Sequence, residues 1–116
     1  MMSSYFCMDV YREERPWGAF EQFTHNEKST VKILIVKDVL SYQRHKYRDE
    51  FWRVISGEGY AVLNDTKIPL EKGDELFIKR GDKHRLASSK GMEVLEISFG
   101  NFDEEDNERL EDKYGR

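Results

Sequence analysis

The chain has 116 residues and a net charge of −4, with 36% charged and 38% hydrophobic residues. This composition favours one folded domain over disorder, no apolar run approaches the roughly 18 residues of a membrane span, and Lys and Arg are not clustered as nucleic-acid binding requires. Cys7 is the single cysteine, which excludes a disulfide within the chain. No secretory signal is visible, so we expect a cytoplasmic protein.

Short strand-like segments follow one another through the middle of the chain. The first, Thr30–Lys37, is rich in β-branched residues and predicts a largely buried strand. Four more strands, each bounded by Gly, Asp or Asn, are predicted at Phe51–Ser56, Gly59–Leu63, Glu75–Lys79 and Met92–Phe99. We expect hairpin turns at residues 57–59 and 64–66. With no helical period between them, these segments predict an all-β antiparallel sandwich or barrel.

The last segment has a different character. From residue 103 onward it holds seven acids and three bases, which leaves residues 1 to 102 with sixteen of each sign. Asp103 can cap a helix, Arg109 and Lys113 suit its negative end, and Gly115 can stop it. We therefore predict a single domain over residues 1–116, with a barrel at about residues 15–100 and a short acidic C-terminal helix at about residues 103–114.

Four side chains with metal-binding atoms fall in two short segments: Gln43, His45 and Glu50 in the first, and His84 in the second. Two imidazoles, one carboxylate and one amide oxygen make a mixed nitrogen and oxygen site without a thiolate. Such a set suits a divalent zinc, manganese, iron, cobalt or nickel ion that keeps a position open to water. The sequence therefore predicts one divalent metal.

Strand alternation indicates which of these side chains share an interior. Gln43 and His45 are two residues apart, so they face the same side of a strand. Glu50 and Trp52 share one face of the next strand, while Phe51 points to the other. We expect a turn between His45 and Glu50 to bring the two strands side by side.

These residues resemble the two motifs of the cupin superfamily. The first motif is matched by Gln43, His45, Glu50 and Gly57, with Gln in place of the usual first His. The second is matched by Gly73, Gly81 and His84, with Lys79 where Pro usually stands. The resemblance implies a double-stranded β-helix, or jelly-roll barrel, and a homodimer that pairs through edge strands.

Three separated motifs give a narrower resemblance, to the type II mannose-6-phosphate isomerase cupins that are often fused to mannose-1-phosphate guanylyltransferase. The matches run from about Glu14 to Arg116. They are Arg-Pro-Trp-Gly-Ala-Phe at residues 15–20, the run formed by Gln43, His45, Arg48, Glu50 and Trp52, and a C-terminal set formed by Arg109, Asp112, Tyr114, Gly115 and Arg116.

The chain departs from that family beside His45. Lys46, Tyr47 and Phe51 stand where the family usually has histidines. By alternation Phe51 faces away from the metal, whereas Lys46 and Tyr47 are expected at the barrel mouth, where they would alter substrate handling.

The resemblance implies a sugar-phosphate isomerase that converts mannose 6-phosphate to fructose 6-phosphate. Such a reaction passes through an enediolate, whose charge a Lewis-acid metal stabilises. The base is not identified by the sequence, and Lys32, Tyr47 and Lys46 are candidates by residue type. Candidate substrate contacts, chiefly for the phosphate, are Arg15, Arg48, Arg85, Lys46, Trp52 and Arg116.

The sequence is compatible with alternative roles for three residues and with alternative functions. Arg48 is either a catalytic or substrate contact or the partner of Asp49 or Glu50 in an ion pair, and Trp17 and Trp52 are either core residues or sugar platforms. A non-enzymatic cupin that binds a sugar or sugar phosphate as an accessory module is the main rival function, and the missing histidines favour it. A small metal-dependent dioxygenase uses the same ligand types.

Overall fold

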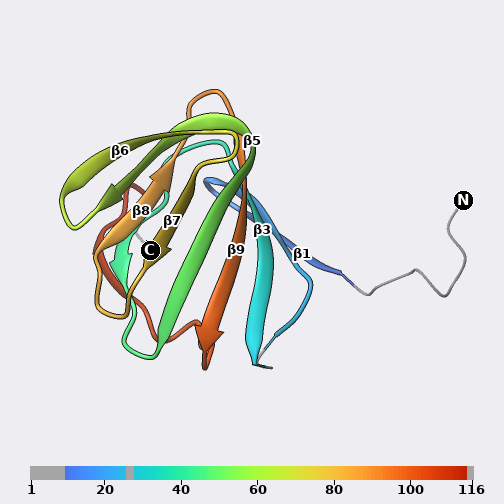
Figure 1. The fold of residues 1–116 in the computed structure, drawn as a ribbon, viewed down its shortest axis with the longest axis vertical. Helices are drawn as coiled ribbons and strands as arrows, with labels where there is room; N and C mark the ends of the chain where they lie inside the picture. The colour runs from blue at the N-terminus through green and yellow to red at the C-terminus, as the bar shows by residue number, and fades with distance from the viewer. Residues whose placement is uncertain (1–9, 26–27, 115–116) are drawn as a thin grey trace, which may run out of the picture.

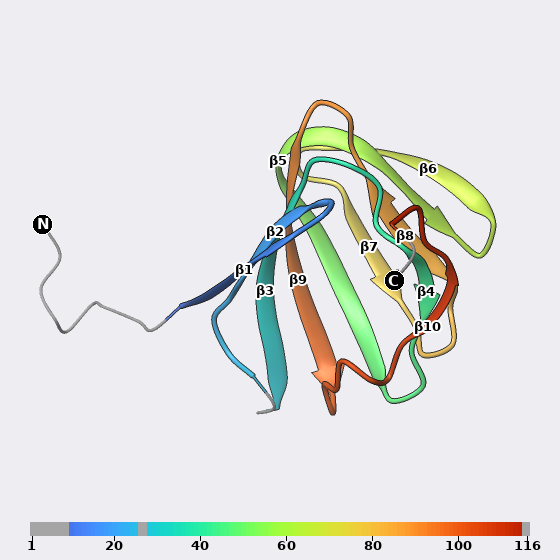
Figure 2. The same cartoon turned by 180° about the vertical axis from the view of Figure 1, so that it is seen from behind.

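The structure is a computed structural model that describes residues 10–25 and 28–114. Within these ranges the chain forms ten strands and no helix (Figures 1 and 2). In chain order the strands are β1 (Tyr11–Arg15), β2 (Gly18–Gln22), β3 (Ser29–Val36), β4 (Tyr42–Arg44), β5 (Arg48–Leu63), β6 (Thr66–Glu71), β7 (Glu75–Ile78), β8 (His84–Ala87), β9 (Met92–Gly100) and β10 (Glu108–Glu111).

Strand β5 belongs to two sheets. Its first half pairs with β9 and β7, which gives the order β1-β2-β3-β9-β5-β7, and its second half pairs with β6 and β8, which gives β6-β5-β8-β4-β10. All of these pairings are antiparallel, and Figure 1 shows β5 curving from the first sheet into the second. The predicted all-β antiparallel class is therefore confirmed.

The predicted turn at residues 57–59 is wrong. The two strands that it was to separate are the two halves of β5, which bends at this point instead of reversing. The pairing with β9 shifts register between Val54 and Ser56, and Gly57 has a φ of 77°. A β-carbon on Gly57 would lie 2.1 Å from the carbonyl oxygen of Gly91, so the bend requires glycine.

The turn predicted at residues 64–66 is confirmed. Asn64 and Asp65, with φ values of 47° and 69°, connect β5 to β6 as a two-residue hairpin. The strand predicted at Thr30–Lys37 corresponds to β3, and those predicted over residues 75–79 and 92–99 correspond to β7 and β9.

The predicted C-terminal helix is absent, and an extended segment takes its place. Residues 103–106 turn, and β10 then pairs with β4 along the outer edge of the second sheet, as Figure 2 shows. Arg44 of β4 binds Glu108 at 2.7 Å, and Arg85 of β8 binds Glu111 at 3.1 Å. An isolated helix of three turns is only marginally stable in water. In the strand, by contrast, the acidic side chains form ion pairs with basic side chains of neighbouring strands.

The inner faces of the two sheets enclose the core. Alternation is strict along β3 and along the first half of β5, where inward residues are buried and outward residues are not. The buried cluster consists mainly of large apolar side chains, namely Trp17, Phe20, Leu34, Val36, Leu40, Trp52, Val54, Ala61, Leu70, Ile78, Leu86, Met92 and Val94. In the described part of the chain, no helix is long and apolar enough to cross a membrane.

Candidate metal centre

Three buried side chains meet between the two sheets. Glu50 comes from the first half of β5, in the first sheet, while His84 begins β8 and His45 follows β4, both in the second. Oε1 of Glu50 lies 3.1 Å from Nε2 of His84 and 3.5 Å from Nε2 of His45. The ligand atoms of the three residues all lie within 4.8 Å of one another.

Sequence reasoning expected the strands around His45 and Glu50 to lie side by side, and that expectation is wrong. Strand β8 lies between β4 and the second half of β5, while Glu50 pairs with β9 and β7. The two side chains meet because the sheets face each other across the interior. The site therefore depends on the curl of the fold and not on one local hairpin.

Backbone carbonyls fix the orientation of both imidazoles. Nδ1 of His45 donates to the carbonyl oxygen of Asp106 at 2.7 Å, and Nδ1 of His84 donates to that of Asp82 at 2.9 Å. Because a carbonyl only accepts, each Nδ1 carries the hydrogen in the neutral ring. Each Nε2 therefore presents a lone pair toward Glu50, the arrangement typical of metal-binding histidines.

Glu50 is left with an unsatisfied oxygen. Oε1 is buried and accepts no hydrogen bond from the described residues, although it lies against two imidazole nitrogens. Burial raises the pKa of Glu50, but the two histidines outweigh that effect and hold the pKa well below its ordinary value. Burial lowers the pKa of His84, yet the Glu50 carboxylate raises it overall.

These residues fit a divalent cation. Three lone pairs converge on one point, two of them from histidines of fixed orientation, and the carboxylate oxygen lacks a donor. The chain supplies a possible metal site of two imidazoles and one carboxylate, whose metal its donor set leaves open among several divalent ions.

Gln43 lies on the same side as these ligands but is less buried. Its Nε2 donates to the carbonyl oxygen of Ser41 at 3.4 Å, and its backbone pairs with that of His84. Gln43 also lines the cavity that contains the three ligands. Its position agrees with the predicted ligand set, and its role as a ligand remains a prediction.

Arg48 lies beside the three ligands and is itself buried. Its Nε is 3.5 Å from Oε2 of Glu50, and its Nη2 is 3.2 Å from Nε2 of His45. Of the two ion-pair partners considered, the structure favours Glu50, because Asp49 instead pairs with Arg80. The guanidinium thus supplies positive charge where the carboxylate and the imidazole lone pair converge.

The cavity around the three ligands has a volume of about 90 Å³. That volume corresponds to roughly three water molecules. Among the described residues, five cationic side chains line it: Arg15, Lys32, Arg48, Arg85 and Arg109. Three carboxylates line it as well: Glu50, Glu96 and Glu104.

Several candidates from the sequence reach this cavity and others do not. Lys32 and Trp52 are buried in its wall, where Trp52 belongs to the core and packs edge-on against His84 with ring centroids 5.5 Å apart. Lys46 and Tyr47 lie outside it, and the side chain of Tyr47 is among the exposed ones, at 62%. Arg116 lies outside the described residues.

Sequence reasoning missed two groups that shape this site. Glu96 is buried on β9 and accepts a hydrogen bond from the indole Nε1 of Trp52 at 3.0 Å. Its signal was present, since it occupies an inward position in the alternation of the strand predicted at residues 92–99. Asp106, which orients His45, had no such signal because its segment was predicted to be helical.

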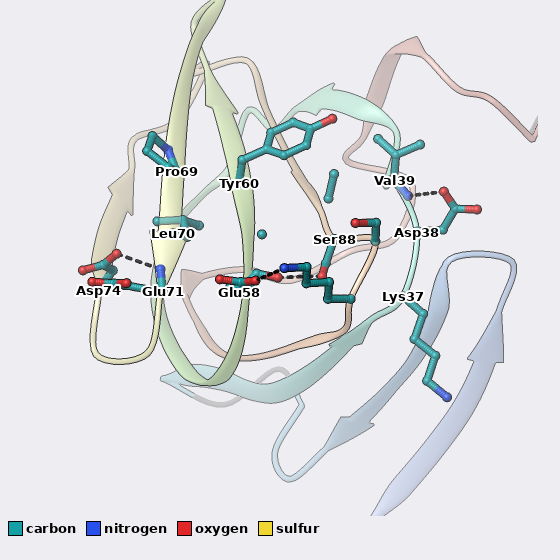
Figure 3. A pocket seen from close by; sticks show the side chains of 14 residues that line it. Lys37, Asp38, Val39, Glu58, Tyr60, Pro69, Leu70, Glu71, Asp74 and Ser88 are labelled. Carbon is teal, nitrogen blue, oxygen red and sulfur yellow. Dashed lines mark hydrogen bonds and ion pairs between the residues drawn. The ribbon is translucent and has the colours of Figure 1, made fainter.

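A second and larger hollow, of about 1000 Å³, lies away from the metal ligands (Figure 3). Its polar groups are largely paired with one another: Ser88 donates to the carbonyl of Glu58, Lys90 binds Glu58 at 2.9 Å, and Asp74 accepts from the amide of Glu71. Figure 3 shows these pairs along its wall. The smaller cavity contains the three converging ligands and is therefore the candidate functional site.

The chain matches a family model described as mannose-6-phosphate isomerase C-terminal over residues 5–112. It is 36% identical over 113 residues to the alginate biosynthesis protein AlgA of Pseudomonas aeruginosa. It is 33% identical over 113 residues to the mannose-1-phosphate guanylyltransferase ManC of Salmonella typhimurium. Each alignment covers 93% of this chain and 23% of the relative, so the chain spans about a quarter of their length.

Solved structures agree with this fold. A cupin protein from Bacteroides fragilis superimposes with a TM-score of 0.60 and 25% identity, covering 64% of this chain and 67% of that one. The capsular polysaccharide assembling protein CapF of Staphylococcus aureus reaches 0.78 with 21% identity, over 95% of this chain and 37% of that one. A single-substitution variant of Streptomyces PAC13 with uridine reaches 0.81 with 16% identity, over 97% of this chain and 93% of that one. The cupin fold is thereby confirmed.

Proposed function

Because the chain belongs to the family of mannose-6-phosphate isomerase C-terminal domains, we propose that it is a metal-dependent isomerase of mannose 6-phosphate and fructose 6-phosphate. The observation that carries this proposal is the convergence of His45, Glu50 and His84 on one unsatisfied point inside a cavity with a cationic mouth. The rival is a module that binds the sugar phosphate without converting it.

An aldose-ketose isomerase must stabilise negative charge on two neighbouring oxygens. A divalent ion held by His45, Glu50 and His84 would supply the Lewis acid for that charge. Arg48 adds a fixed positive charge, because its guanidinium lies over the ring of Phe102 at 4.3 Å and donates to the carbonyl oxygen of Asp103 at 3.1 Å. These contacts hold it in place before substrate arrives, which is the condition for efficient charge stabilisation.

The substrate phosphate would stay at the cavity mouth. Arg15, Arg85 and Arg109 line the cavity, and none of them is fully buried. Arg15 lies 3.7 Å from Glu104, and Arg85 binds Glu111, so each is held by a carboxylate that a phosphate dianion can replace. Bidentate Arg contacts are well suited to a phosphate group.

The test is a coupled assay for fructose 6-phosphate formed from mannose 6-phosphate, run with zinc, manganese, iron, cobalt and nickel. We expect turnover in the parent with at least one metal, and loss of metal binding and turnover in His84→Ala. A matched control is His25→Ala, which changes a histidine that lies against Phe102 but does not line the cavity. Thermal stabilisation by mannose 6-phosphate without turnover would refute the isomerase and support the binding module.

A further inference from the structure

Glu96 is a buried carboxylate that the metal site does not use. It is 7% exposed, points inward from β9 and lines the same cavity as the metal ligands. Its Oε2 accepts a hydrogen bond from the indole Nε1 of Trp52 at 3.0 Å. Burial of a carboxylate costs free energy unless the charge is paired and hydrogen-bonded. The position of Glu96 in the cavity wall therefore suggests a function for it.

The strand register places Glu96 beside the metal-binding carboxylate. On the inner face of the first sheet, Glu96 of β9 pairs with Trp52 of β5, and Glu50 of β5 pairs with Ser98 of β9. Glu50 and Glu96 are therefore diagonal neighbours, whose β-carbons lie about 7–8 Å apart or somewhat less. Both side chains face the inner side of the sheet and line the same cavity.

We propose that Glu96 is the general base that moves the proton between the two reacting carbons of the sugar phosphate. This inference rests on the proposed isomerase function and names the base that the function requires. Of the three candidates by residue type, Tyr47 and Lys46 lie outside the cavity, whereas Lys32 lines it with its Nζ 3.9 Å over the ring of Phe102. Glu96 is inside it and faces the same space as the ligands.

The step balances without an oxidant, a reductant or a further reactant. Glu96 removes the proton from the hydroxyl-bearing carbon next to the aldehyde. The electrons of that C–H bond form a carbon-carbon double bond, and the carbonyl electrons move onto the aldehyde oxygen. Return of the proton to the former aldehyde carbon, with transfer of the hydroxyl proton to the former aldehyde oxygen, yields the ketose.

The surroundings of Glu96 suit a group that both accepts and releases a proton. Burial and the negative charge of Glu50 raise its pKa to about 7, while Lys32 acts in the opposite direction. Lys32 pairs with Glu96 across the sheet, and its Nζ lies 3.9 Å over the ring of Phe102 and 4.0 Å from Glu104. A carboxylate whose pKa is raised accepts a proton more readily than an ordinary one.

The test compares Glu96→Gln with the parent and with Glu93→Gln. Glu93 lies on the same strand but on the outer face, where Ser56 donates to it at 3.1 Å, so its variant controls for loss of a strand carboxylate. Metal affinity, Tm, kcat and KM are measured together with the incorporation of solvent deuterium into the sugar phosphate. The glutamine carbonyl still accepts from Trp52, so we expect Glu96→Gln to fold and to bind metal like the parent.

In Glu96→Gln we expect kcat to fall by a factor on the order of 10² to 10⁴ and deuterium incorporation to stop, with KM changed by about threefold or less. In Glu96→Asp, which keeps a carboxylate, we expect slow turnover and an altered acidic limb of the pH profile. Parent-like exchange in Glu96→Gln overturns the assignment and leaves the isomerase standing. If Glu96→Gln and Glu96→Asp both lose the metal or fail to fold, Glu96 has a structural role and the assignment as general base is overturned as well. A parent that converts no substrate refutes the proposed function, and the base assignment fails with it.

Discussion

The segment that orients His45 gives the sharpest prediction, because it lies outside the metal ligands themselves. The carboxylate of Asp106 accepts hydrogen bonds from the backbone amides of Lys46 at 2.8 Å and Tyr47 at 2.9 Å. These bonds hold the backbone of Asp106 where its carbonyl meets Nδ1 of His45 at 2.7 Å. Burial raises the pKa of Asp106, but the two amides lower it overall, so the carboxylate is ionised at neutral pH.

Asp106→Ala removes both amide contacts and frees the carbonyl that fixes the His45 ring. Loss of a hydrogen-bonding partner of a metal ligand costs about 10- to 100-fold in metal affinity, which is about 1.4 to 2.8 kcal/mol. We expect a decrease of that size in Asp106→Ala and a smaller one in Asp106→Asn, which keeps one acceptor. The measurement is competition of zinc or cobalt between the protein and a chromophoric chelator at fixed pH.

The matched control is Glu105→Ala, which removes an exposed carboxylate from the neighbouring position. The side chain of Glu105 makes no ion pair or hydrogen bond within the described residues. Equal losses of affinity in Asp106→Ala and Glu105→Ala would indicate a general effect of negative charge and refute the positioning role. Unchanged affinity in Asp106→Ala would refute it too.

Three further predictions concern stability and assembly. The raised pKa of His84 stabilises the metal-free protein fully below the unfolded value of about 6.5, and the contribution is lost as pH rises through the folded value. The Tm of the metal-free parent should therefore fall across that window more steeply than the Tm of His84→Gln, and equal slopes would contradict this. Gly57→Ala should lower the free energy of unfolding by about 2–4 kcal/mol in urea, because a β-carbon there meets a carbonyl oxygen at positive φ. Gly73→Ala, also at positive φ but in open space, should lower the free energy of unfolding by about 1–2 kcal/mol. Equal losses in the two variants would refute the steric requirement for glycine at Gly57. Phe77 is 48% exposed on the outer face of the first sheet and packs near a phenylalanine of β9, so we expect a homodimer that covers this face. Phe77→Glu should sediment as a monomer and Lys67→Gln as a dimer, whereas a monomeric parent would exclude the interface.

Local patterns predicted the parts of the fold that local physics decides. Alternation identified β3 and β9, and it placed Glu50 and Trp52 on the inner face of β5 with Phe51 on the other, as the burial of these residues confirms. The hairpin at Asn64 and Asp65 followed from residues that tolerate positive φ. Each of these features depends only on neighbours within a few residues of the chain.

Features that depend on the curl of the fold could not be predicted in the same way. Two glycines around Glu58 indicate a hairpin as readily as a bend, and only the partners β6 and β9 determine which one forms. The acidic C-terminal segment has good helix caps, but β4 offers it a free edge and Arg44 a partner for Glu108. Tertiary pairing overrides a weak local preference in a segment this short.

The three missing histidines bear on function only through where their replacements lie. Lys46 and Tyr47 are exposed beyond the cavity, and their backbone amides, which any residue provides, are the groups that bind Asp106. Phe51 lies on the outer face of the first sheet, opposite Phe77. None of the three side chains lines the cavity, so their change leaves the ligands, Arg48 and the cationic mouth in place. The three replaced histidines are therefore no longer an argument for a non-enzymatic module. The choice between enzyme and binder depends on the groups inside the cavity.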